Sequence, residues 1–67
     1  MQNLIDNIIV NRDNEAGFVG YSIDYGPSIV DRSQREFFVS FPQARRFYNE
    51  QRGRGNSVGM FYIYEEA

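Results

Sequence analysis

The chain has few of the side chains that carry out catalysis. Its 67 residues include no His, Cys, Lys, Thr or Trp. The usual general base, the usual thiol nucleophile and a tunable amine are therefore all missing, and only carboxylate chemistry remains. Without His and Cys the chain also lacks the usual zinc ligands and any disulfide. The composition argues against an enzyme, and we expect no cofactor.

Asp13 and Glu15 are the one pair of neighbouring carboxylates that could hold a hard cation in a loop. A calcium loop starting at Asp13 would need a glycine where Phe18 stands, and no bidentate Glu follows at the required distance. The pattern is more typical of a solvated turn. We predict no metal site, and we interpret Glu65 and Glu66 as a solubilising tail.

The glycine-rich stretch over 53–59 has some likeness to a phosphate-binding loop. Such loops leave a strand and open a helix, whereas this stretch leaves a predicted helix and enters a predicted strand. We therefore interpret it as a helix stop followed by a connection.

Four arginines gather near the middle of the chain, around Phe47 and Tyr48; they are Arg45, Arg46, Arg52 and Arg54. Basic residues interleaved with aromatics can hold phosphates and stack bases. However, the two aromatics fall on an apolar helical stripe, and such arginines are commonly a solvated helix face. The chain carries a net charge of −2 and shows no recognised nucleic-acid motif. Direct nucleic-acid binding is thus less favoured than protein binding.

Charge is segregated along the chain. Residues 1–31 hold five carboxylates against Arg12 alone, residues 32–54 hold six arginines against two glutamates, and Glu65 and Glu66 follow near the end. A bipolar chain of this kind can pair with a second copy of itself or offer one charged face to a partner.

The clearest local pattern predicts a helix over 42–52. Ser40 and Gln43 have the spacing of a capping box, and Pro42 is tolerated in the first turn. An apolar face then recurs at helical spacing, formed by Ala44, Phe47, Tyr48 and Gln51. Gly53 suits the position directly after the helix.

Alternating or β-branched runs predict strands over 18–25, 35–41 and 57–64. Residues 4–11 fit a helix or a strand, and we interpret them as a strand in a hairpin with 18–25. The strand over 57–64 is apolar on both faces, which favours a central position. The prediction is one domain over 1–67 of the α+β class, with a small, mostly antiparallel β-β-β-α-β sheet and one helix on one face.

One helix of this length cannot cover both faces of such a sheet. We predict that the uncovered face carries aromatic side chains drawn from Tyr21, Tyr25, Phe38, Tyr62 and Tyr64, while Phe37, Phe41, Phe47 and Phe61 form the core. An exposed aromatic face usually marks an interaction site. The candidate partner-binding residues are Arg45, Arg46, Arg52, Arg54, Tyr21, Tyr25, Tyr62 and Tyr64.

In size and composition the chain is similar to small phage proteins that act on host machinery, such as polymerase blockers and anti-CRISPR proteins. The resemblance implies a phage-type or mobile-element-type inhibitor that occludes a surface of a larger host protein or protein–nucleic acid complex. Two alternatives stay open: a nucleic-acid-binding accessory protein that uses the Arg-rich helix, and a structural subunit that forms a homodimer or larger oligomer. The N-terminal apolar run is too short for a signal peptide or membrane span, so we expect a cytoplasmic location, inside a host cell if phage-encoded.

Overall fold

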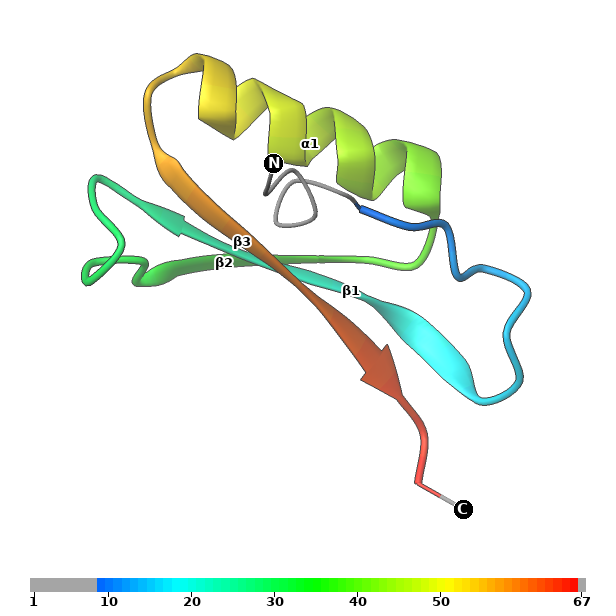
Figure 1. The fold of residues 1–67 in the computed structure, drawn as a ribbon. Coiled ribbons are helices and arrows are strands. Elements are labelled where there is room, and N and C mark those ends of the chain that lie inside the picture. Colours follow the sequence, from blue (N-terminus) through cyan, green and yellow to red (C-terminus); the bar gives the residue numbers. More distant parts are fainter. Residues whose placement is uncertain (1–8, 67) are drawn as a thin grey trace, which may run out of the picture.

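The computed structural model describes residues 9–66, which form three strands and one helix (Figure 1). Along the chain come β1 (Phe18–Gly26), β2 (Gln34–Phe38), α1 (Phe41–Gly53) and β3 (Ser57–Tyr64). As the sequence predicts, this is a small α+β fold with the helix on one face of an antiparallel sheet. Of the predicted first strand, residues 4–8 lie outside the described residues, and residues 9–11 belong to no strand.

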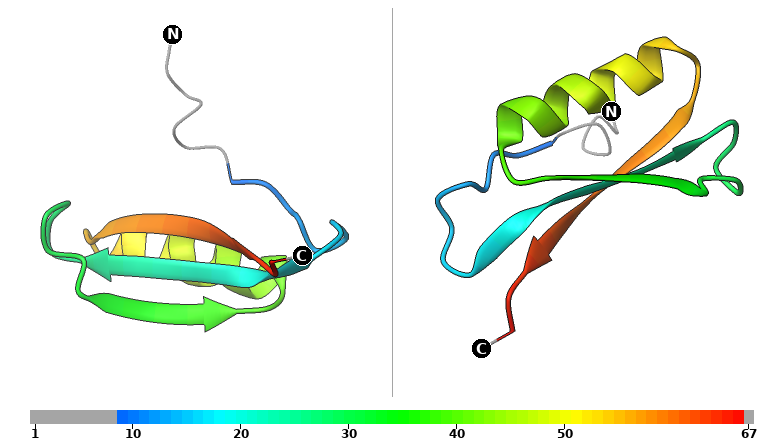
Figure 2. Two further views of the ribbon diagram at one scale, coloured as in Figure 1. Left: turned by 90° about the horizontal axis from the view of Figure 1, so that it is seen from below. Right: turned by 180° about the vertical axis from the view of Figure 1, so that it is seen from behind.

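β1 is the central strand. The order is β2-β1-β3, and β1 pairs antiparallel with both neighbours (Figure 2). The prediction that the strand over 57–64 lies at the centre is wrong for the sheet of residues 9–66, in which β3 lies at an edge. The helix carries the chain from β2 across the sheet to the far side of β1, so the backbone of β1 is paired on both sides. The prediction relied on β3 being apolar on both faces of the sheet. That pattern does not determine whether the N–H and C=O groups along both edges of the strand are paired.

A loop over residues 27–33 joins β1 to β2 and contains a turn. Its turn is closed by the Asp31 N–H, which donates to the Ser28 carbonyl oxygen at 2.9 Å. Ile29 and Val30 are strongly exposed at the tip and neither extend a strand nor pack beneath the loop. A Cβ added to Gly26 would lie 1.7 Å from the Asp31 carbonyl oxygen, so this close approach of two backbones admits only glycine.

The core lies between α1 and the sheet. Ala44, Tyr48 and Gln51 are buried on the helix side, as the helical spacing predicts. They face Tyr21 and Ile23 of β1, which are fully buried. A ring of partly buried apolar side chains surrounds this centre, among them Phe18, Tyr25, Phe38, Phe41, Phe47, Val58, Met60 and Tyr62. Phe41 and Phe47 therefore belong to the core as predicted.

The start of α1 is capped from elsewhere in the chain. Ser40 occupies the N-cap position, yet its side chain makes no capping hydrogen bond, so the predicted capping box with Gln43 is wrong. Instead, the Asp13 carboxylate accepts from the Phe41 N–H, at 3.2 and 3.3 Å from its two oxygens. A carboxylate at this end of a helix is favoured by the helix dipole.

The end of α1 is a Schellman motif centred two residues later than predicted. The Asn56 N–H donates to the Gln51 carbonyl oxygen at 3.1 Å, and the Gly55 N–H donates to that of Arg52 at 3.0 Å. Gly55 has φ of +87°, the left-handed conformation this motif needs, whereas Gly53 is the last residue of the helix. The Asn56 side chain adds a bond to Gln51 Oε1 at 2.7 Å.

Candidate binding surface

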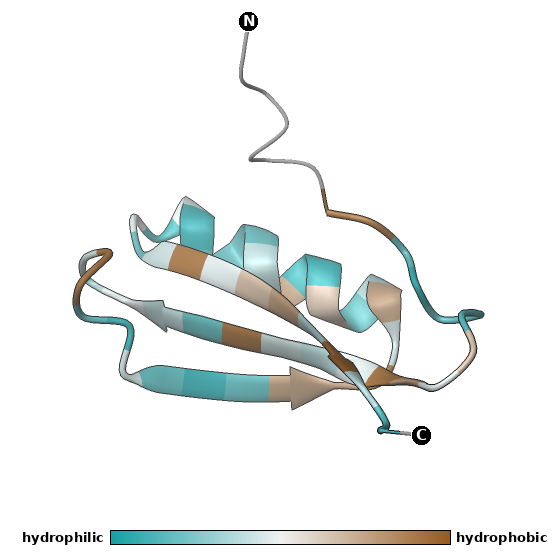
Figure 3. Ribbon diagram, turned by 60° about the horizontal axis from the view of Figure 1, so that its bottom comes forward, coloured by the Kyte–Doolittle hydropathy of each residue, from teal (hydrophilic) through white to brown (hydrophobic). Residues whose placement is uncertain are grey.

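One face of the sheet is turned away from α1, and we call it the open face (Figures 2 and 3). Ser22 follows the buried Tyr21 in β1 and therefore points to this face. It pairs with Phe37 of β2 on one side and with Phe61 of β3 on the other. Paired residues share a face, so both phenylalanines belong to the open face. Ile63 joins them through its pairing with Gly20.

Phe37, Phe61 and Ile63 form what we call the open-face patch. Their exposed fractions are 49%, 50% and 37%. The prediction that Phe37 and Phe61 are core residues is wrong, because the only helix of the described residues covers the other face. Large apolar side chains this accessible and this close together are the usual mark of an interaction site.

Small residues of β1 form the floor of the open-face patch. A Cβ added to Gly20 would lie 2.4 Å from the Phe37 ring, so the ring lies directly over this glycine. Ser22 is buried between the two phenylalanines. Beside them lies an open depression of about 310 Å³, lined by Ser22, Asp24, Arg35, Phe61 and Ile63. The depression is present because β1 contributes no large side chain at this place.

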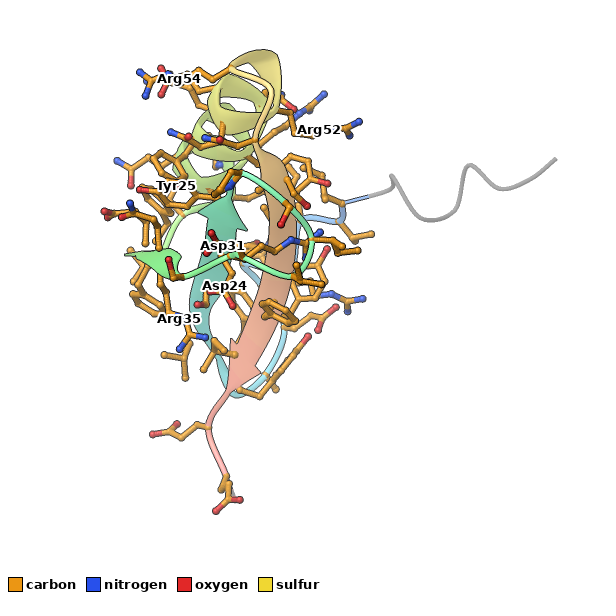
Figure 4. The ribbon with its side chains drawn as sticks, turned by 90° about the vertical axis from the view of Figure 1, so that its left-hand side faces the viewer. Asp24, Tyr25, Asp31, Arg35, Arg52 and Arg54 are labelled. Carbon is orange, nitrogen blue, oxygen red and sulfur yellow. The ribbon has the colours of Figure 1, made fainter. Side chains whose placement is uncertain are left out.

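A charged group borders the depression (Figure 4). Arg35 donates two hydrogen bonds to the Asp24 carboxylate, from Nε to Oδ1 at 2.6 Å and from Nη2 to Oδ2 at 3.0 Å. The hydrogen bonds from Arg35 hold the pKa of Asp24 below its ordinary value. Nearby, Arg32 Nε donates to Ser57 Oγ at 3.0 Å, and its guanidinium lies over Gly59. The apolar patch thus has a polar rim, as protein interfaces do.

The predicted tyrosine face is wrong. Tyr21, Tyr25 and Tyr62 lie on the helix side of the sheet, packed in or against the core. The Tyr21 side chain is fully buried, and Tyr25 packs edge-on against Phe47 with ring centroids 5.1 Å apart. Tyr64 is on the same side beyond the helix, where it contacts the Phe18 ring and hydrogen-bonds Glu15. Whether these tyrosines contact a partner stays a prediction, and for Tyr21 the burial argues against it.

The four predicted arginines are exposed on α1 and just after it. Figure 4 shows Arg52 and Arg54 at the helix end, far from Arg35 and Asp24 on the sheet. Arg52 lies over the Tyr48 ring at 5.8 Å, and Arg46 borders a shallow groove with Phe38 and Phe47. The structure therefore places the Arg-bearing surface and the open-face patch on different parts of the molecule.

A β-bulge interrupts the alternation of side chains at the start of β1. The pairing register between β1 and β3 shifts between Phe18 and Gly20, so strict alternation fails at the start of β1. Phe18 turns to the helix side, with its ring 4.7 Å from that of Tyr21, and Val19 is left exposed. In the sequence, the small residues Gly20, Ser22 and Gly59 were the signal for the open face. The large side chains of this face lie over or beside them and need positions with little side chain of their own.

Asp13 and Glu15 both make contacts within the fold. The Tyr21 hydroxyl donates to Asp13 Oδ1 at 2.7 Å, and Glu15 pairs with Arg12 at 2.8 Å. Over residues 9–66 no group of three potential metal ligands is gathered in one place. In the same range no helix is long and apolar enough to cross a membrane. Comparisons of this chain with protein-family models, with curated proteins and with solved structures found no match.

Proposed function

We propose that this chain is a non-enzymatic protein-binding domain that acts by covering a surface of a larger protein with its open face. The observation that supports this most is the exposure of the open-face patch on a sheet that, over residues 9–66, has helical cover on one side only. In a two-layer fold, an aromatic face of a sheet is normally buried, and the face that no other layer covers is normally polar. Here Phe37 and Phe61 remain half exposed.

The chemistry of the patch suggests the kind of partner. The depression beside Phe61 accepts an apolar side chain, and aromatic residues around such a pocket supply most of the binding energy in known interfaces. The rim carries Arg32 beside the ion pair of Arg35 and Asp24, and Arg32 favours a partner that places a carboxylate nearby. Occlusion of a host protein in the manner of small phage inhibitors, within the cytoplasm, is the form of action we propose.

The test compares two variants with the wild type in affinity capture from host lysate, with mass spectrometry. Phe61→Thr together with Ile63→Thr removes the apolar patch but keeps residues that favour strands. We expect capture of the partner to fall at least about tenfold, the effect of losing roughly 1.4 kcal/mol at the centre of an interface. The melting temperature should stay close to that of the wild type, because neither side chain is buried.

The matched control is Arg45→Glu with Arg46→Glu, which reverses charge on the opposite side of the molecule. This variant should capture the same protein as the wild type, in nuclease-treated lysate as well. If the control loses capture while the patch variant keeps it, the proposal fails in favour of the Arg-bearing helix. Capture that also disappears with nuclease would identify nucleic acid as the ligand.

A further inference from the structure

Arg32 leaves the loop after β1 and places its guanidinium on the open face, over the start of β3. Nε donates to Ser57 Oγ at 3.0 Å, and Nη1 would lie 2.5 Å from a Cβ added at Gly59. Ser57 and Gly59 alternate along β3 with Val58, which packs against the core, so both belong to the open face. The Arg32 side chain is partly buried and is anchored at Nε, so its terminal nitrogens have a defined position beside β3.

The terminal nitrogens of Arg32 are not used by the part of the chain that the structure describes. Among residues 9–66, Arg32 forms no ion pair, and its hydrogen bond uses Nε alone. Asp24, which pairs across from Gly59, accepts from Arg35 on both carboxylate oxygens. The hydrogen bonds from Arg35 lower the pKa of Asp24, and the charge of Arg32 adds to this effect. Two guanidiniums and one carboxylate leave this cluster with one positive charge.

The depression of the open face begins next to this charge. Gly59 and Phe61 are two residues apart on the same side of β3, which is about 7 Å along a strand. A Cβ added at Gly59 would lie 3.7 Å from the Phe61 ring, so the ring and the Arg32 guanidinium are neighbours. Ile63 and Ser22 continue the lining of the depression beyond Phe61. A cation and an apolar recess thus lie side by side on one surface.

We propose that Arg32 and the depression beside Phe61 form one site for a carboxylate that is flanked by an apolar group, such as an acidic side chain next to a leucine or phenylalanine of the partner protein. This inference rests on the proposed function and names the chemistry of the partner. A guanidinium binds a carboxylate through two parallel N–H donors, and the flanking group fills the depression. Residues i and i+2 of an extended partner segment, about 7 Å apart, have the matching spacing.

The charge of the cluster favours a carboxylate over a phosphate. One net positive charge matches a monoanion. A phosphate monoester carries a charge of about −1.5 to −2 near neutral pH, and the ionised Asp24 would repel it more strongly than it repels a carboxylate. A phosphorylated ligand is the alternative that the experiment separates from the proposal.

Nuclear magnetic resonance titration of the full chain tests the site with small probes. The probes are 4-phenylbutanoate, 4-phenylbutanamide and 3-phenylpropyl phosphate, which share a phenyl ring and differ in the polar end. The carboxylate should bind at least about fivefold more tightly than the amide, because it accepts charge-assisted hydrogen bonds from Arg32. It should shift the backbone signals of Gly59, Phe61 and Ile63. The phosphate should bind no more tightly than the carboxylate.

Variants distinguish recognition by Arg32 from a structural role. Arg32→Gln should lower the affinity for the carboxylate to that for the amide and leave the amide affinity unchanged, because the depression stays intact. A purely structural role would weaken the binding of both probes. Arg54→Gln is the matched control, since it removes the same charge at the helix end, far from Asp24 and Arg35 (Figure 4). It should leave all three affinities unchanged.

Equal affinities of the wild type for the carboxylate and the amide would overturn the proposal. So would the absence of binding by either probe at about 10 mM, a concentration above the dissociation constants usual for ligands of this size. A phosphate that binds at least about tenfold more tightly than the carboxylate would assign the site to a phosphorylated ligand instead.

Capture from lysate separates this inference from the proposed function. Arg32→Gln should lower recovery of the partner protein at least about fivefold. If Phe61→Thr with Ile63→Thr loses capture while Arg32→Gln keeps it, the proposed function stands and the carboxylate site fails. If the probes bind as expected and the Phe61→Thr, Ile63→Thr variant keeps capture, the carboxylate site stands and the proposed function fails.

Discussion

Asp13 connects three parts of the chain that lie apart in the sequence. Its carboxylate accepts the Tyr21 hydroxyl of β1 and the Phe41 N–H at the start of α1. The Arg12 N–H donates in turn to the Tyr21 hydroxyl at 2.8 Å. A buried tyrosine hydroxyl needs such partners, and an unmade bond of this kind is costly. The residue interpreted from sequence as part of a solvated turn is therefore structural.

Replacing Asp13 with Ala should lower the free energy of unfolding by about 2 kcal/mol, because the helix loses its cap and the Tyr21 hydroxyl its acceptor. Asp13→Asn keeps an acceptor oxygen and should cost less. Urea unfolding of Asp13→Ala, Tyr21→Phe and the double variant measures the coupling between the two residues. Additive effects of the two single changes would show that this bond contributes nothing.

At the scale of elements, the two glycines around the end of α1 have different roles. Gly55 has a positive φ in the Schellman motif, while nothing lies within 4 Å of a Cβ added at Gly53. Local sequence does not distinguish them, because Gly53, Arg54 and Gly55 all fit a helix stop. Only the register of the last hydrogen bonds decides which glycine takes the left-handed conformation.

Gly55→Ala should destabilise the protein by about 1 kcal/mol, the cost of a left-handed conformation for a residue with a Cβ. Gly53→Ala should be neutral or stabilising by up to about 1 kcal/mol, because alanine favours the helix and meets no neighbour. Thermal unfolding of the two variants gives the comparison. The reverse order of stability would mean that Gly53, and not Gly55, takes the left-handed conformation.

The elements themselves were largely predictable, and their arrangement was only partly so. The helix was expected over 42–52 and is found at Phe41–Gly53, and β3 has the predicted bounds. Local spacing determines such features. The central position of β1, the bulge beside Phe18 and the exposure of Phe61 depend on which strands pair and on which face the helix lies. These are long-range outcomes that a periodic pattern does not contain, so the uncovered face of the sheet was assigned to the wrong side chains.

For the molecule as a whole, the composition dictates how stability responds to pH. No side chain has an ordinary pKa between about 5 and 9, because His and Cys are absent. On the acid side, Arg35 lowers the pKa of Asp24, so this stabilisation is present above about pH 4 and is lost as the pH falls through the lowered value. On the alkaline side, burial and the bond to Asp13 raise the pKa of Tyr21. Its contribution is present below about pH 10 and is lost as the pH rises.

We therefore expect a plateau of stability from about pH 5 to 9 with a decline on each side. Asp24→Asn should flatten the acid limb, and Tyr21→Phe should make the alkaline limb less steep. Chemical unfolding at a series of pH values measures both. A marked change of wild-type stability near neutral pH would contradict this account.

The aromatic cluster around Tyr21 has a practical consequence. Its ring contacts Phe18, Phe41 and Tyr62, with centroids 4.7, 5.7 and 5.8 Å away. Rings held in a fixed, asymmetric environment produce near-ultraviolet circular dichroism, which vanishes when tertiary packing is lost. The chain contains no Trp to dominate that region of the spectrum. The protein thus carries its own optical probe, at the point where the loop, the central strand and the helix meet.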